Sequence, residues 1–204
     1  MAGNGKHLPA EERRAVIVET VLELAAEGNP SEITTASIAE RMRLTQGALF
    51  RHFPSKDAVW SAVMEWVAER LLSLVERSVK EASTPLAALE AAFTANVRFV
   101  AEHPGAPRLL FGELQRTGES APRNIAKTLM RRYAERLRLL VDEGKERGEI
   151  RRDVSSDEAA HLLIGVVQGL VIQSLLAGDS QTMLRRAPDA FAIFRRGIEE
   201  VGRS

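Results

Sequence analysis

The sequence has no cysteine and no long uninterrupted apolar run. The lack of cysteine excludes disulfide bonds and thiolate chemistry, and it agrees with a reducing compartment. The longest apolar segment, Leu162 to Ile172, is interrupted by two glycines and a glutamine and is shorter than the roughly 18 to 20 residues that span a bilayer. The first seven residues have no apolar stretch behind their lysine, as a secretory signal would. We therefore expect a cytoplasmic protein without a membrane partner.

Net charge is also absent, because 28 Lys and Arg balance 28 Asp and Glu. On its face this balance argues against a protein that binds nucleic acid, since phosphate neutralisation supplies most non-specific affinity. The charges are unevenly distributed, however. Residues 34–57 contain four Lys and Arg but only two Asp and Glu, whereas six Glu lie upstream. The pattern favours a narrow basic surface that contacts one short groove segment.

Helical periodicity covers almost the whole chain, and no alternating strand pattern, internal repeat or low-complexity tract interrupts it. Capping residues, glycines and prolines separate the periodic segments. The fold class is therefore all-α, with a three-helix head up to Pro54, a long connecting helix and a helical bundle, about nine helices in all. The expected helices cover residues 9–27, 35–42, 45–53, 55–79, 85–103, 106–115, 123–148, 155–177 and 181–201.

Two short helices with a tight turn are expected between residues 34 and 56, where apolar side chains can form a buried seam. Thr35 and Thr45 can cap the two helices. Gln46, Gly47 and Ala48 then lie on the first turn of the second helix, where small residues allow close approach to a groove and a glutamine amide can pair with adenine. The seam consists of Ile38, Ala39, Met42, Leu44, Leu49 and Phe53. This arrangement predicts a helix-turn-helix that contacts DNA bases.

Residues suited to phosphate surround this motif. Thr34 stands at one helix N-terminus, and Ser55 and Lys56 stand at another, where unpaired N–H groups and the helix dipole favour anions. Arg51 and His52 lie on or beside the same face and can reach the DNA backbone.

The run from Thr34 to Lys56, TTASIAERMRLTQGALFRHFPSK, closely resembles the DNA-binding motif of the TetR family of bacterial regulators. The resemblance covers about residues 9–70 and implies a homodimer that binds double-stranded DNA at a near-palindromic operator and is released by a small-molecule effector. It implies a DNA-binding domain at 9–70 and a ligand-binding and dimerisation domain at 71–204, with no cofactor. The candidate DNA-binding residues are Thr34, Thr35, Arg43, Thr45, Gln46, Gly47, Ala48, Phe50, Arg51, His52, Ser55 and Lys56.

Two residues depart from the family's pattern. Phe50 stands where the family commonly has tyrosine, so a hydroxyl that would bond phosphate is missing and only ring packing remains. Arg43 stands where the family often has glycine, which costs stability if the turn needs a positive φ, although an arginine there can contact phosphate.

In the C-terminal half, Gly165 and Gly169 lie four residues apart on an apolar helix and permit close approach of another helix. With Phe191, Phe194 and Ile198 of the last helix they are candidates for a dimer interface, packing within one chain being the alternative. A ligand pocket is mostly apolar with a few placed polar groups, although such polar residues are often satisfied within the core. The candidate ligand-binding residues are Phe93, Asn96, Val100, Phe111, Tyr133, His161 and Gln168.

Two other functions compete with this interpretation. An enzyme is not expected, because the four histidines are scattered and no metal-binding, phosphate-binding or nucleophile motif is present. The second alternative is a nucleoid-associated or structural DNA-binding factor of the same fold that has no small-molecule inducer. An enclosed cavity in the bundle would distinguish the two DNA-binding alternatives.

Overall fold

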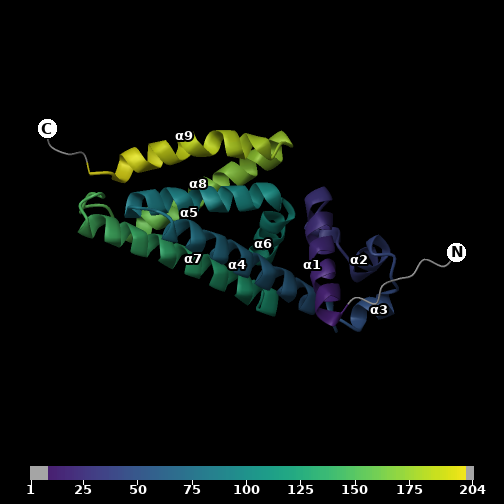
Figure 1. The fold of residues 1–204 in the computed structure, drawn as a ribbon. Coiled ribbons are helices and arrows are strands. Elements are labelled where there is room, and N and C mark those ends of the chain that lie inside the picture. Colours follow the sequence, from purple (N-terminus) through teal and green to yellow (C-terminus); the bar gives the residue numbers. More distant parts are fainter. Residues whose placement is uncertain (1–8, 201–204) are drawn as a thin grey trace. The chain divides into compact units, whose positions relative to one another are not determined.

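The computed structural model describes residues 9–200, which form nine α-helices and one short 3-10 helix (Figure 1). The expected all-α fold and number of helices are confirmed. The elements are α1 (Ala10–Glu27), η1 (Pro30–Glu32), α2 (Thr35–Arg41), α3 (Gln46–Phe50), α4 (Lys56–Lys80), α5 (Pro85–Glu102), α6 (Gly105–Gln115), α7 (Ala121–Glu146), α8 (Ser156–Ala177) and α9 (Gln181–Ile198).

The helices form two compact units. The first contains the described residues up to Val67 together with Gly105–Ala126, and the second contains Ala68–Pro104 together with the described residues from Lys127 onward. The chain thus returns to the first unit at α6, so the units do not follow a single division at residue 70. The assignment of DNA binding to 9–70, and of ligand binding and dimerisation to 71–204, concerns roles and stays a prediction.

In the first unit, α6 packs closely on α1. A Cβ atom at Gly105 would lie 2.0 Å from the Leu22 carbonyl oxygen and 3.0 Å from the Ala26 nitrogen, so only glycine fits at this contact. Arg108 Nη1 donates a hydrogen bond to the Gly28 carbonyl oxygen at 3.1 Å and thereby satisfies a carbonyl at the end of α1. The head is therefore supported by a helix far from it in sequence.

In the second unit, α9 packs on α5 and α8 (Figure 1). The rings of Phe93 and Phe191 lie 5.4 Å apart, and those of Phe191 and Phe194 lie 5.8 Å apart. Phe191, Phe194 and Ile198 are at most 5% exposed. These three residues, expected at a dimer interface, instead form part of the core of one chain, because α9 turns its strongly amphipathic apolar face inward.

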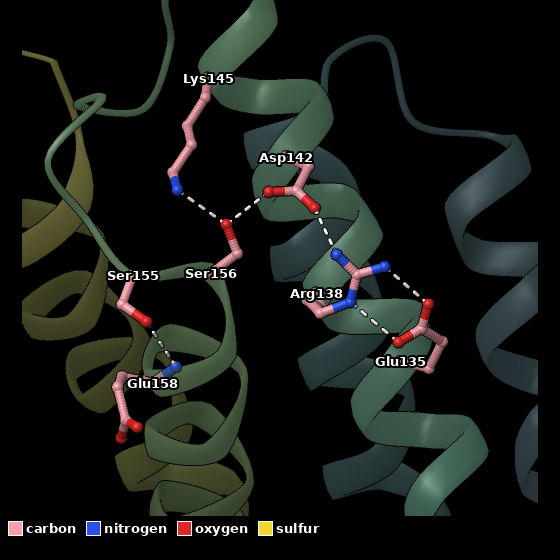
Figure 2. Close-up of polar contacts among 7 residues, drawn as sticks. All are labelled: Glu135, Arg138, Asp142, Lys145, Ser155, Ser156 and Glu158. Carbon is pink, nitrogen blue, oxygen red and sulfur yellow. Dashed lines mark hydrogen bonds and ion pairs between the residues drawn. The ribbon is translucent and has the colours of Figure 1, made fainter.

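A polar network joins α7 to the first turn of α8 (Figure 2). Ser156 Oγ accepts a hydrogen bond from Lys145 Nζ at 2.8 Å and donates one to Asp142 at 2.5 Å. Asp142 also accepts from Arg138 Nη1 at 2.6 Å, and Arg138 pairs with Glu135 through two further bonds. The Arg138 guanidinium lowers the pKa of the Glu135 carboxyl by hydrogen bonding. The network links the C-terminal part of α7 to the first residue of α8.

Among the described residues, one helix, α8, is long and apolar enough by length and composition to cross a membrane. Gly165, Gln168 and Gly169 divide the apolar stretch of this helix, so it contains no uninterrupted apolar run of that length. The core helix of a soluble protein passes the same test, and 44% of the most apolar part of α8 is buried in the chain.

Candidate nucleic-acid interface

The first helix of the predicted pair, α2, is capped by Thr34. Thr34 Oγ1 accepts a hydrogen bond from the Ser37 N–H at 3.0 Å, while Ser37 Oγ accepts one from the Thr34 N–H at 3.0 Å. This reciprocal capping box corrects the expectation that Thr35 is the cap, because Ser37 lies at the third helical position counted from Thr34. Thr35 is instead the first helical residue and is half-buried.

The turn after α2 passes through Arg43, whose φ is 54°. The Arg43 N–H donates to the Glu40 carbonyl at 2.9 Å, and the Leu44 N–H donates to the Ala39 carbonyl at 2.8 Å. This is the bond pattern of a Schellman motif, which usually has glycine at the left-handed position. The turn therefore does need a positive φ, and an arginine there costs about 1–2 kcal/mol relative to an unstrained backbone.

The second helix, α3, begins at Gln46 after the cap Thr45, whose Oγ1 accepts from the Ala48 N–H at 3.1 Å. It ends at Phe50 and not at residue 53 as expected. After Phe50 the chain continues as a turn, in which the N–H groups of residues 52 and 53 share the Leu49 carbonyl, at 2.9 and 3.1 Å.

The exposed first turn of α3 carries the predicted base-reading residues. Gln46 and Gly47 are exposed and Ala48 is half-buried, so nothing on this turn blocks close approach. Gln46 Nε2 donates to Thr35 Oγ1 at 3.4 Å, which joins the first residues of α2 and α3. The Phe50 ring is 43% exposed, as expected for a residue that contributes surface and not core.

Helix α4 begins beside the same surface. Ser55 Oγ accepts from the Ala58 N–H at 3.1 Å. Lys56 Nζ donates to the Ile33 carbonyl at 2.5 Å and lies 4.6 Å from the centroid of the Trp60 ring. Lys56 is therefore held by contacts within the head, a role that the sequence did not indicate because Ile33 and Lys56 share no helix.

Fewer positive side chains of the head are available to phosphate than the residue types indicate. Arg41 forms a two-pronged ion pair with Glu27 of α1, and its guanidinium lowers the pKa of the Glu27 carboxyl by hydrogen bonding. Arg43 and Arg51 are exposed and form no ion pair with any residue between 9 and 200. These two arginines therefore keep charge available for phosphate.

Of the six residues of the predicted seam, Ile38, Ala39, Leu49 and Phe53 are buried, whereas Met42 and Leu44 are half-buried. Ile38 and Leu49 are 0% exposed, and Phe53 is 1% exposed. The Arg14 guanidinium of α1 lies 4.6 Å from the centroid of the Phe53 ring, a contact that adds a cation to the head. Sequence reasoning missed Arg14, because nothing in the local pattern of α1 relates it to Phe53.

All twelve predicted DNA-binding residues lie in the first unit, between α2 and the start of α4, and none is buried. The exposed ones are Thr34, Arg43, Thr45, Gln46, Gly47, Phe50, Arg51, Ser55 and Lys56, and the half-buried ones are Thr35, Ala48 and His52.

The predicted ligand-binding residues are more dispersed. Phe93, Asn96 and Tyr133 are buried in the second unit, and Val100 and Gln168 are half-buried there, whereas Phe111 belongs to the first unit. His161 is exposed, and its Nδ1 pairs with the Asp157 carbonyl of its own helix at 2.8 Å, so it does not point into the core.

Tyr133 is the most informative member of the ligand-binding set. Its hydroxyl is buried and forms no hydrogen bond of normal geometry with the described residues. Burial raises the pKa of Tyr133 to about 12, and the neighbouring Asn96 opposes the shift. A tyrosine hydroxyl is protonated at neutral pH even with its ordinary pKa, so this buried group can donate a hydrogen bond. A depression of about 450 Å³ in the same unit is lined by Ser78 and by residues of α5 and the loop before it, and it contains none of the predicted ligand-binding residues.

Known proteins resemble the chain in both halves. Residues 17–63 match the family described as bacterial regulatory proteins, tetR family, and residues 113–191 match the tetracyclin repressor-like C-terminal domain. The nucleoid occlusion factor SlmA of Vibrio cholerae is 30% identical over 170 residues, which cover 83% of this chain and 85% of that protein.

Solved structures share the fold over nearly the whole chain. The ketosteroid transcriptional regulator KstR2 of Mycobacterium tuberculosis matches with a TM-score of 0.80 at 20% identity, covering 98% of this chain and 99% of that one. The regulator FadR of Bacillus subtilis, in complex with stearoyl-CoA, matches with a TM-score of 0.77 at 16% identity, covering 90% and 98%.

The sequence match, the shared fold and the exposed helix-turn-helix agree with one another. The family is one of regulatory proteins and not of enzymes. The chain belongs to the tetR family of bacterial regulatory proteins and is a DNA-binding regulator.

Proposed function

We propose that this protein is a homodimeric, cytoplasmic repressor that binds a near-palindromic operator and is released by a small molecule bound in its second unit. The observation that carries the proposal is the exposed first turn of α3, where Gln46 and Gly47 stand clear of the core. Gln46 contacts a base edge, and the other residues of the predicted set contact phosphate or fit the groove.

Each half of a palindromic operator needs one head, so the proposal requires a second copy. An exposed face of α8 supports this requirement. Leu162, Gly165, Gly169, Ile172 and Leu176 follow the three-four spacing of a helix–helix seam, and the three larger side chains are 59%, 47% and 83% exposed. A Cβ atom at either glycine would meet nothing within 4 Å, so another backbone can approach there. We assign the dimer contact to this face together with the exposed Ile193 of α9.

The effector site is proposed around Asn96 and Tyr133. Asn96 lies beside the buried Tyr133 hydroxyl, which donates to no acceptor among the described residues, so a ligand that accepts a hydrogen bond can add one. The ketosteroid transcriptional regulator KstR2 and the regulator FadR in complex with stearoyl-CoA have the same fold, and they support an apolar ligand as the class to test first.

A second candidate is a nucleoid-associated DNA-binding factor without an inducer. The similarity to the nucleoid occlusion factor SlmA favours it, because that match covers most of both chains. The number and distribution of binding sites distinguish the two functions. A repressor with an operator has few sites beside promoters, whereas a nucleoid factor has many sites spread over the chromosome.

The proposal is tested by incubating the full chain with fragmented DNA of the source genome, recovering bound fragments and sequencing them. Enrichment of a few promoter regions that share a near-palindrome supports the repressor. Dispersed enrichment supports the second candidate, and no enrichment over input refutes both.

A further inference from the structure

We infer that Lys56 is a positioning residue that sets the orientation of the Gln46 amide through the N-terminus of α2. The inference rests on the proposed function of Gln46 as the residue that contacts a base. It assigns to Lys56 an effect on sequence preference, which a residue that only neutralises phosphate does not have.

The first step is the anchoring of the Lys56 ammonium. Its Nζ donates to the Ile33 carbonyl at 2.5 Å and lies 4.6 Å from the centroid of the Trp60 ring. Ile33 and Trp60 are both only 5% exposed, so the carbonyl and the ring are held by the core. A charge-assisted hydrogen bond and a cation–π contact act on the same ammonium and fix its position.

Lys56 holds the peptide unit between Ile33 and Thr34, just before α2. The Ile33 carbonyl and the Thr34 N–H belong to one planar peptide unit. Lys56 binds the oxygen of this unit, and Ser37 Oγ accepts its N–H at 3.0 Å as part of the α2 capping box. Both ends of the peptide are therefore fixed, and with them the direction of the first helical residue, Thr35.

A side-chain hydrogen bond connects Thr35 to Gln46, the proposed base-reading residue. Gln46 Nε2 donates to Thr35 Oγ1 at 3.4 Å. A glutamine amide has two N–H donors and one carbonyl acceptor, so this bond leaves one donor and the acceptor free. In the major groove, adenine presents the N7 acceptor and the N6 amino donor, which pair with the remaining amide donor and the amide carbonyl of glutamine. Thr35 thus turns the amide toward the pairing that adenine needs.

The experiment selects bound duplexes from a random-sequence library with the full chain and four head variants. Lys56→Met keeps the unbranched stem and removes the ammonium, whereas Lys56→Arg keeps a donor and a positive charge. Thr35→Val removes only the hydroxyl, and Gln46→Ala removes the amide. Arg51→Met is the matched control, because Arg51 is an exposed cation of the same head that forms no ion pair within residues 9–200.

The inference predicts that Lys56→Met and Thr35→Val lose preference at the same base position as Gln46→Ala, by about 5-fold or more. Lys56→Arg should retain the preference, and Arg51→Met should weaken binding to all sequences alike. Circular dichroism and thermal unfolding establish that each variant is folded. If Lys56→Met does not fold, Thr35→Val provides the same test of the path to Gln46.

The inference is overturned if Lys56→Met, or Thr35→Val in its place, selects the wild-type sequence with unchanged preference at every position. In that case Lys56 acts on phosphate alone and the proposed function stands. If the unmodified chain itself enriches no sequence, the proposed function fails, which is a different outcome of the same experiment.

Discussion

Gly105→Ala tests the contact by which α6 supports the DNA-binding head. The added Cβ would lie 2.0 Å from the Leu22 carbonyl oxygen, and 3.0 Å from both the Leu22 carbonyl carbon and the Ala26 nitrogen. All three atoms belong to the backbone of α1, so no side chain can rotate away. The two helices must separate by about 1.5 Å to restore an ordinary contact distance.

Such overpacking costs about 1–3 kcal/mol, and the change in helix propensity offsets at most about 1 kcal/mol of it. Gly112→Ala is the matched control, because Gly112 lies on the same helix and an added Cβ there meets nothing within 4 Å. The control should be more stable than the wild type by about 0.5–1 kcal/mol.

Urea unfolding of both variants, at one fixed protein concentration, measures the difference through the two tryptophans of α4. The expected result is a lower midpoint for Gly105→Ala and a higher midpoint for Gly112→Ala. A Gly105→Ala variant with the same urea midpoint as the Gly112→Ala control would show that α1 and α6 do not pack as closely as described.

Three further perturbations test other parts of the structure. Arg43→Gly should raise the free energy of unfolding by about 0.5–1 kcal/mol, because relief of the strained φ exceeds the entropy that glycine adds to the unfolded chain. In a salt titration, the slope of DNA affinity against salt concentration should fall by about one unit. A variant less stable than the wild type would contradict the claim that Arg43 is strained. The folded pKa of Tyr133 is about 12 against 10.0, so the folded chain binds more protons between these values and stability should fall by roughly 2–3 kcal/mol as pH rises through that window. Tyr133→Phe should remove this loss in urea unfolding and should not destabilise the protein at neutral pH. Because Tyr133 is the one tyrosine in the sequence, tyrosinate absorbance reports its ionisation directly. A tyrosine that titrates near pH 10 in the folded chain would refute the burial of its hydroxyl. Ile172→Glu should convert the proposed dimer to monomer in analytical ultracentrifugation, whereas Arg132→Glu on the exposed surface of α7 should not. A dimer that Ile172→Glu leaves unchanged would refute the assignment of the interface to this face of α8.

The sequence predicted those features that depend on local periodicity. Ile38, Leu49 and Phe53 recur at helical spacing, and each is buried where the pattern placed it. The positive φ at Arg43 was raised as a condition by the family resemblance, because the family often has glycine at this turn, and the structure settles it.

Features that depend on contacts between distant segments were not predictable in this way. Helix α8 is apolar nearly all round, so its pattern does not show which face packs inward. The apolar face of α9 follows from its periodicity, but its packing on α5 and α8 of the same chain, which buries Phe191 and Phe194, depends on contacts between distant segments. Gly105 and Gly112 look alike in sequence, yet only one of them lies against another backbone.

The helix-turn-helix shows the same limit at the level of single side chains. Residue types identified Lys56 as a cation near DNA, but its bond to Ile33 joins two segments that no periodic pattern relates. Capping by Thr34 in preference to Thr35 likewise depended on the reciprocal bond from Ser37.

The central claim is that Gln46, on the exposed turn of α3, reads a base in a specific DNA site. The most direct measurement is the affinity of the wild type and of Gln46→Ala for two duplexes, one carrying the selected site and one scrambled, at the same salt concentration. We expect Gln46→Ala to lose roughly 5- to 150-fold in affinity for the selected site, the equivalent of about 1–3 kcal/mol, and to bind the scrambled duplex as the wild type does. Equal losses on both duplexes, or no loss on either, would contradict the account.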